Sequence, residues 1–135
     1  HQQRDIGTAS NSFRDIYGQT ITVSNAYDSK GDLRRIPRKE PTSGTSYTLV
    51  ADDTGRVIYI STGGVTNNNS VMSGNEIITI INNSGSDQTI TQGSGVSMYN
   101  TADASTGNRT LAGRGMATLW FLNDAYAYIS GSGLS

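Results

Sequence analysis

Short segments in which apolar and polar residues alternate recur from residue 46 onward. They run at 46–51 (SYTLVA), 56–61 (RVIYIS), 76–82 (EIITIIN), 88–92 (QTITQ), 96–99 (VSMY), 117–122 (ATLWFL) and 125–130 (AYAYIS). Short runs rich in Ile, Val, Thr and Tyr between turn-forming residues are typical of strands in a sandwich or barrel. No segment carries the sustained apolar stripe of an amphipathic helix. The pattern therefore predicts an all-β chain.

Turn-forming residues between consecutive strands predict three β-hairpins. Asp53-Thr54-Gly55 separates the first two segments, and residues 83–87 (NSGSD) separate the third and fourth. Asn123-Asp124 separates the last two segments, and a two-residue loop of this kind can take the positive φ angles of a type I′ turn. Together these hairpins predict an antiparallel β-sandwich that is jelly-roll-like.

The segment 76–82 is apolar on both of its faces. Because side chains alternate along a strand, Ile78 and Ile80 lie on one face, and Ile77 and Ile81 lie on the other. A strand of this kind is usually central in its sheet and covered on both sides. We therefore expect it to lie in the middle of the fold.

The first 40 residues differ from the rest of the chain. Residues 5–17 carry four bulky apolar side chains among small and polar ones, namely Ile6, Phe13, Ile16 and Tyr17. One further strand is predicted at 19–24. The run 30–40 holds half of the ten Lys and Arg residues, and prolines at positions 37 and 41 restrict it to extended or turn conformations. We expect a stalk or trimerisation segment over residues 1–40 and a globular head over residues 41–135.

Composition narrows the classes of protein that fit. Hydrophobic residues make up 34% of the 135 residues, which is below the usual globular share and suggests that other subunits complete the core. A net charge of −1 argues against a nucleic-acid-binding protein, which is normally basic. No run approaches the roughly 20 apolar residues of a membrane span, so we expect no membrane insertion. The lack of cysteine and of any histidine after His1 excludes disulfides and a Ser-His-Asp triad.

Two short motifs invite a catalytic or phosphate-binding interpretation. Asp53-Thr54-Gly55 matches the aspartic-protease triplet, but that chemistry needs two carboxylates that share a proton. Gly113-Arg114-Gly115 lacks the Lys and Ser/Thr that follow the glycines of a phosphate loop. We therefore interpret the first motif as a turn and the second as a turn or bulge.

Acidic and basic side chains leave further alternatives open. Paired carboxylates for glycoside cleavage would come from Glu76, Asp87, Asp103 and Asp124, each of which lies beside a predicted turn. Metal binding by Asp52, Asp53, Asp103 or Asp124 would use widely scattered residues. The basic run 30–40 would bind phosphate groups on an acidic surface, or pair with acids of its own or a neighbouring chain. We assign no catalytic residue, no cofactor and no metal site, and we expect no enzymatic activity.

Candidate binding residues are aromatic or amide side chains. Trp120, Tyr126 and Tyr128 cluster in the last predicted hairpin, and Tyr99 ends another strand. Their common role is packing between strands, and the alternative is a surface on which sugar rings stack. Asn67, Asn68 and Asn69 form a polar loop that would suit a hydroxyl-rich ligand.

The residues of two regions resemble known virion proteins. The segment from Asp5 to Tyr17 (DIGTASNSFRDIY) resembles short segments that are common in bacteriophage tail-fibre proteins. The stretches 47–55 (YTLVADDTG), 74–80 (GNEIITI), 82–91 (NNSGSDQTIT) and 113–118 (GRGMAT) resemble a phage fibre-head module. That module recurs in virion proteins, including those of phages that infect marine bacteria and cyanobacteria.

The resemblance implies a function and an assembly. It implies a homotrimeric tail fibre of the virion, located outside the cell, in which an interwoven stalk carries a receptor-binding head. Ile6, Phe13, Ile16 and Tyr17 would form the trimer interface, and the head would bind a host cell-surface glycan or another receptor. Other virion proteins would attach on the N-terminal side. The alternatives are a capsid decoration or head-fibre protein and a surface-glycan hydrolase.

Overall fold

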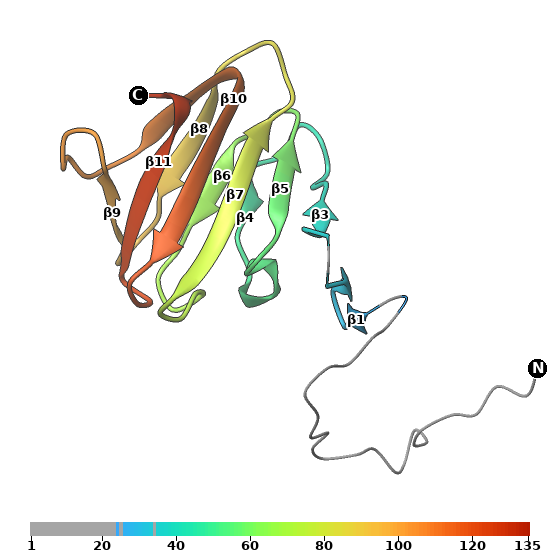
Figure 1. Cartoon of the computed structure of the whole chain (residues 1–135). Coiled ribbons are helices and arrows are strands. Elements are labelled where there is room, and N and C mark those ends of the chain that lie inside the picture. Colours follow the sequence, from blue (N-terminus) through green and yellow to red (C-terminus); the bar gives the residue numbers. More distant parts are fainter. Residues whose placement is uncertain (1–23, 25, 34) are drawn as a thin grey trace, which may run out of the picture.

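The computed structural model describes residues 24, 26–33 and 35–135, and nearly all regular structure in these residues is β-strand (Figure 1). One short 3₁₀ turn, η1 (Ala51–Asp53), interrupts the strands of this part of the chain. The strands are β1 (Tyr27–Asp28), β2 (Gly31–Asp32), β3 (Arg38–Lys39), β4 (Tyr47–Thr48), β5 (Val57–Ile60), β6 (Val65–Asn67), β7 (Glu76–Asn82), β8 (Gln88–Gln92), β9 (Ser97–Asn100), β10 (Arg109–Phe121) and β11 (Tyr126–Leu134). The predicted all-β class is confirmed.

Several predictions lie outside the described residues. The candidate trimer-interface residues Ile6, Phe13, Ile16 and Tyr17 are among them, as is most of the predicted strand at 19–24. β1 and β2 form a small separate hairpin, and β3 already pairs with β5 in the main sheet. The described sheet therefore begins two residues before the expected boundary at residue 40.

Strands β3 to β11 form a single nine-stranded sheet that curls around the core. Its order is β3-β5-β7-β10-β8-β6-β4, and β11 adds to β10 and β9. The long strand β10 joins the two halves, because residues 109–111 pair with β8 and residues 116–121 pair with β7. An irregular stretch lies between these two parts, and Arg114 within it has a left-handed φ of 63°. In Figure 1 the two halves face each other, and β10 passes from one to the other.

Successive strands from β3 to β8 alternate between the two halves of the sheet. β3, β5 and β7 are parallel neighbours in one half, and β4, β6 and β8 are parallel neighbours in the other. The predicted hairpins 46–51/56–61 and 76–82/88–92 are therefore wrong, as is the antiparallel order expected for these strands. The antiparallel pairs of this sheet all involve β10.

Buried polar side chains explain why the two connections cross over instead of forming hairpins. At the first, the carboxylate of Asp53 accepts a hydrogen bond from Val50 N and holds the 3₁₀ turn in place. At the second, Asn82 Nδ2 donates to the carbonyls of Ser86 and Ala112, at 2.8 and 2.9 Å. Asp53 also binds Lys39, 14 residues away, and the bond from Asn82 to Ala112 spans 30 residues. Contacts distant in sequence therefore accompany local turn chemistry at each crossover.

The third predicted hairpin, formed by β10 and β11, is confirmed. Its predicted two-residue loop is wrong, because β10 ends at Phe121, β11 begins at Tyr126, and neither Asn123 nor Asp124 has a positive φ. Trp120 lies opposite Tyr128, and Phe121 lies opposite Ala127. In the connecting turn, Asn123 Oδ1 accepts hydrogen bonds from Ala125 N and Tyr126 N, both at 2.9 Å. An Asn side chain that satisfies backbone N–H groups in this way is a common turn determinant.

The core fills the space between the two halves of the sheet. Ile58, Ile60, Ile78 and Ile80 enter it from β5 and β7, and Val65 and Ile90 enter it from β6 and β8. β7 is flanked by β5 and β10, as expected for a central strand. Ile77, on its outward face, is nevertheless 48% exposed, so the prediction that both faces are covered is wrong. The outward face of this half of the sheet remains open in the single chain.

Candidate functional site

Four predicted binding residues lie side by side on the outward face of the sheet. Tyr128 on β11 is opposite Trp120 on β10 and opposite Tyr99 on β9. Ring centroids of these two pairs are 6.0 and 5.6 Å apart, and Tyr126 lies 6.4 Å from Tyr99. The planes of Tyr99 and Tyr126 differ by 15° and those of Tyr99 and Tyr128 by 28°. We call Tyr99, Trp120, Tyr126 and Tyr128 the aromatic row.

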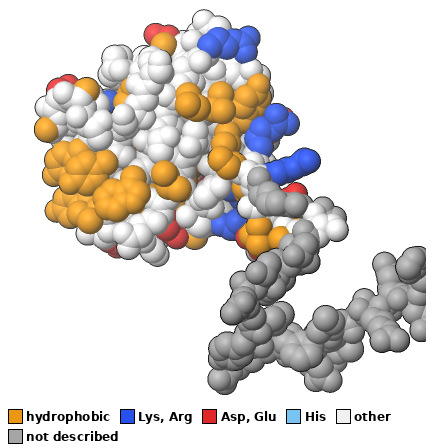
Figure 2. Space-filling model, in the orientation of Figure 1, with side chains coloured by type: hydrophobic (Ala, Val, Ile, Leu, Met, Phe, Trp, Pro, Cys, Tyr) orange, Lys and Arg blue, Asp and Glu red, His pale blue; other side chains and the backbone are white. Residues whose placement is uncertain are grey.

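The aromatic row is open to solvent. Trp120, Tyr126 and Tyr128 are 37%, 43% and 40% exposed, and the neighbouring Leu122 is 49% exposed. Within the described residues, no hydrogen bond engages the hydroxyls of the three tyrosines or the indole N–H of Trp120. Figure 2 shows hydrophobic side chains gathered at the lower left, over the part of the fold that holds β9, β10 and β11 in Figure 1. A contiguous apolar surface with free polar tips is typical of a binding surface.

Charged side chains are absent from the outward face around the row, within the described strands β5, β7 and β9, residues 116–121 of β10 and residues 126–130 of β11. Alternation along these stretches places only apolar, Ser or Thr side chains outward, namely Val57, Tyr59, Ile77, Thr79, Ile81, Ser97, Tyr99, Met116, Thr118, Trp120, Tyr126, Tyr128 and Ser130. Two cations lie farther along the sheet: Arg114 is exposed in the irregular stretch of β10, and the guanidinium of Arg38 lies 5.1 Å from the centre of the Tyr59 ring. The aromatic row is therefore an uncharged surface.

The structure corrects one candidate in the asparagine loop. Asn67 is the last residue of β6 and points inward, like Val65, so its side chain is fully buried and cannot reach a surface ligand. Its amide oxygen and nitrogen have no hydrogen-bond partner in the described chain. Asn68 and Asn69 are half-buried, and Asn69 Nδ2 donates to the Gly95 carbonyl at 3.0 Å. Asn69 thus connects two loops. The inward position of Asn67 follows from alternation along β6, a strand that was not predicted from the sequence.

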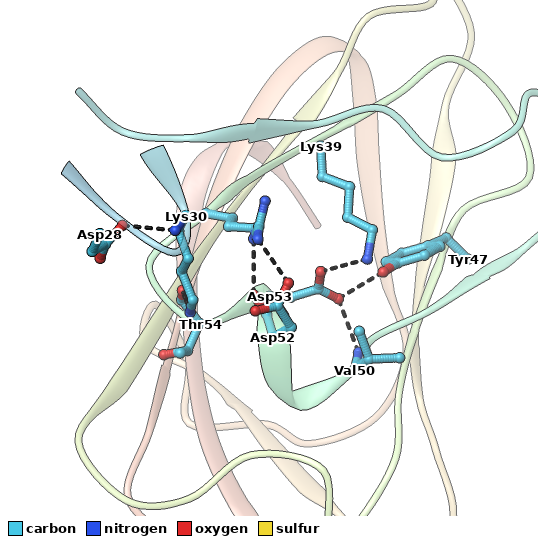
Figure 3. Close-up of polar contacts among 9 residues, drawn as sticks. Asp28, Lys30, Lys39, Tyr47, Val50, Asp52, Asp53 and Thr54 are labelled. Atoms are coloured by element: carbon cyan, nitrogen blue, oxygen red, sulfur yellow. Dashed lines mark hydrogen bonds and ion pairs between the residues drawn. The ribbon is translucent and has the colours of Figure 1, made fainter. Parts of the chain in front are cut away.

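Asp53 forms a buried polar centre at the first crossover (Figure 3). Its carboxylate accepts hydrogen bonds from Lys39 Nζ at 2.9 Å, Tyr47 Oη at 2.8 Å and Val50 N at 2.9 Å. Lys39 also lies 4.9 Å from the centre of the Tyr47 ring, within cation–π range. The neighbouring Asp52 pairs with Arg56 Nη2 at 2.7 Å. Each carboxylate has its own cationic partner, so this centre has the character of a structural site.

The free energy of unfolding is expected to fall at alkaline pH, because Lys39 and Tyr47 lose their protons there. The pKa of Lys39 is raised, first by its side-chain interaction with Tyr47 and then, against the opposing effect of burial, by Asp53. The pKa of Tyr47 is also raised, chiefly by burial. The folded protein therefore holds both protons more tightly than the unfolded chain. The resulting stabilisation is complete below the unfolded pKa values and is lost as pH rises through the folded ones.

We expect the melting temperature to fall above about pH 10, where unfolded tyrosine and lysine titrate. Circular-dichroism melting curves measured from about pH 8 to about pH 11 would show this decrease. Tyr47→Phe removes one titrating group and the strongest influence on the pKa of Lys39, so its decrease should be shallower than that of the wild type. An identical alkaline decrease in both proteins would contradict this origin.

The basic run 30–40 is largely paired within its own chain. Arg38 bonds Glu40 at 2.7 Å, Lys39 bonds Asp53, and Arg35 lies 3.9 Å from Asp32. Lys30 Nζ donates to the Thr54 carbonyl at 2.8 Å, at the edge of a pocket beside the β1–β2 hairpin. Of the two alternatives for this run, pairing with acids is observed, and the acids belong to the same chain.

The remaining carboxylates do not converge. Glu76 Oε2 accepts from Ser73 N, Asp87 Oδ1 accepts from Gly113 N, and Asp103 Oδ1 accepts from Ser105 N and Oγ. The hydrogen bonds from Ser105 lower the pKa of Asp103. Among the described residues, no group of three His, Cys, Asp or Glu side chains is arranged to hold a metal ion. These acids stabilise loops.

Comparison with known proteins gave no match: no protein-family model matches the chain, and no curated protein is similar to it. No helix in the described part of the chain is long and apolar enough to cross a membrane.

Proposed function

We propose that the chain is the receptor-binding part of a phage tail fibre, in which the head, a curled β-sheet, binds glycan on the surface of the host cell. The aromatic row carries this proposal, because it combines exposed rings with unpaired hydroxyl and indole N–H groups on one uncharged face. The apolar faces of sugar rings pack on aromatic side chains, and sugar hydroxyls exchange hydrogen bonds with polar tips. The resemblance of residues 5–17 and of the later stretches to phage fibres supports the setting.

Assembly as a homotrimer would strengthen weak contacts. A trimer carries three copies of the aromatic row, so the second and third copies bind at the high effective concentration set by the first. The low apolar content of 34% supports such an assembly, since subunits then share part of their cores. The N-terminal side would attach to other virion proteins.

The test of this function is the substitution Trp120→Ala, measured on a panel of immobilised polysaccharides. Loss of one stacked aromatic ring removes on the order of 1–1.5 kcal/mol, so we expect roughly a tenfold weaker affinity. Tyr27→Ala is the matched control, because Tyr27 is an exposed aromatic residue on β1, outside the row. The control should bind like the wild type.

Three results would contradict the proposal. The first is a wild-type protein that binds no polysaccharide, and the second is a Trp120→Ala protein with unchanged binding. The third is a Trp120→Ala protein whose assembly dissociates in light scattering, since the row would then be an interface between subunits. Circular-dichroism spectra of all proteins would confirm that they are folded.

A further inference from the structure

We infer that the aromatic row takes an uncharged, extended polysaccharide rather than an acidic one, an inference that rests on the proposed function. The first reason is the absence of cations around the row. The outward positions of the described strands β5, β7 and β9, of residues 116–121 in β10 and of residues 126–130 in β11 carry no Lys or Arg. Proteins bind carboxylate or phosphate groups through Arg and Lys donors, which this surface does not offer.

The second reason is the sign of the charges at the margins of the row. Asp124 is exposed in the β10–β11 turn, two residues before Tyr126. Asp103 is also exposed and follows the end of β9, the strand that holds Tyr99. Exposed acids repel a polyanion, and at physiological salt this repulsion is screened over about 8 Å. An uncharged polymer experiences no such repulsion.

The third reason is that the cations of the described chain are engaged elsewhere. Arg38, Lys39 and Arg56 form ion pairs with Glu40, Asp53 and Asp52, on the side of the sheet that ends in β3. Arg114 lies in the irregular middle of β10, six residues before Trp120, and donates to Asn83 Oδ1 at 2.7 Å. Figure 2 shows most Lys and Arg side chains on the right, away from the hydrophobic patch at the lower left. A polyanion on the row would gain little from them.

The geometry of the row indicates the length of the ligand. Ile77, Trp120, Tyr128 and Tyr99 lie at paired positions on four adjacent strands, β7, β10, β11 and β9. Neighbouring strands are about 4.8 Å apart, so this line runs across the strands for on the order of 14 Å. A single sugar ring covers only part of that length. The ligand that contacts the whole row is therefore a chain of several sugars lying across the strands.

Ser130 provides a way to test the charge preference. It follows Tyr128 on the same outward face of β11 and is exposed, so a new side chain there would lie beside the row without entering the core. We would prepare Ser130→Lys and Ser130→Glu. Their binding would be measured by affinity electrophoresis in gels that contain dextran or mannan as neutral polymers, or alginate or polygalacturonate as acidic ones, at low and high salt.

We expect the wild type to bind a neutral polymer with an affinity that salt changes less than twofold, and to bind the acidic polymers at least tenfold more weakly. Because an uncharged ligand is insensitive to the sign of a nearby charge, Ser130→Lys and Ser130→Glu should bind it equally within about twofold. Short oligosaccharides should compete better as their length increases. Equal competition by a monosaccharide would overturn the extended-chain part of the inference.

The outcomes separate this inference from the proposed function. One outcome would overturn the inference and leave the glycan-binding function intact. In that outcome the protein binds acidic polymers, salt weakens this binding, Ser130→Lys strengthens it, and Trp120→Ala abolishes it. No dependence on Trp120 for any polymer would overturn both. Folding of the Ser130→Lys and Ser130→Glu variants is checked directly, because both must give the wild-type circular-dichroism spectrum and melting temperature.

Discussion

Asp53→Ala is expected to lower the free energy of unfolding by about 3 kcal/mol. The substitution removes the acceptor of three hydrogen bonds and leaves the Val50 N–H and the Tyr47 hydroxyl without a partner. Both bonds are partly buried, and a hydrogen bond to a charged group contributes about 1.5–3 kcal/mol. The side chain of Lys39 is 33% exposed and can hydrate, so its part of the loss is small. Urea denaturation of the purified protein would measure the change.

Two variants act as controls for Asp53→Ala. Asp52 is 64% exposed and forms a surface ion pair with Arg56, so Asp52→Ala should cost less than about 1 kcal/mol. Asp53→Asn keeps the volume and one acceptor oxygen, and its loss should lie between those of the two alanine variants. If Asp53→Ala and Asp52→Ala destabilise equally, the buried carboxylate does not hold the first crossover.

Gly131→Ala is expected to destabilise the protein by about 3 kcal/mol, near the top of the usual range for overpacking. Gly131 lies on β11 opposite Ala117 on β10, where the two strands approach closely. A Cβ atom at this position would lie 2.5 Å from Ala117 Cα and even closer to the carbonyl oxygen of Met116. Both atoms belong to the backbone, so a side-chain rotation cannot relieve the clash. Thermal and urea denaturation would measure the loss.

Gly85→Ala is the matched control for Gly131→Ala. No atom lies within 4 Å of the Cβ that Gly85 would gain, and its φ is not in the left-handed region. The change should therefore be neutral or stabilise the protein by about 0.4–1 kcal/mol through the unfolded chain. A stable Gly131→Ala protein with a native spectrum would show that β10 and β11 can separate without cost.

The longer strands were largely predictable from the sequence, but the short strands β1, β2, β3 and β6, the first part of β10 and most of the strand partners were not. Alternation in 76–82 and 117–122 identified β7 and the second part of β10, because one face of each enters the core. Pairing depends on contacts distant in sequence, such as those of Asp53 with Lys39 and of Asn82 with Ala112. A turn motif reports only the local chain direction, so it predicted a hairpin where the chain crosses over.

The candidate binding surface was predictable in part for the same reason. Trp120, Tyr126 and Tyr128 belong to one hairpin, which the sequence predicted. Its register was not predicted, because a two-residue loop would place Trp120 opposite Ala127, whereas Trp120 lies opposite Tyr128. Tyr99 joins them only because β9 pairs in parallel with β11, which no local pattern reveals. Asn67 was assigned to a loop, since the three residues of β6 are too few to show an alternating pattern.

The position of β10 in the chain sets the order in which the protein can fold during synthesis. Its residues, 109–121, leave the ribosome after all of β3 to β8, yet they supply the described link between the two halves of the sheet. Until then Ile78 and Ile90, which lie in opposite halves, have no strand to join them. Parallel pairing between distant segments is also slow and exposes apolar surface in the meantime. The nascent chain is therefore most vulnerable to aggregation just before β10 emerges, and it becomes protected when that strand closes the sheet.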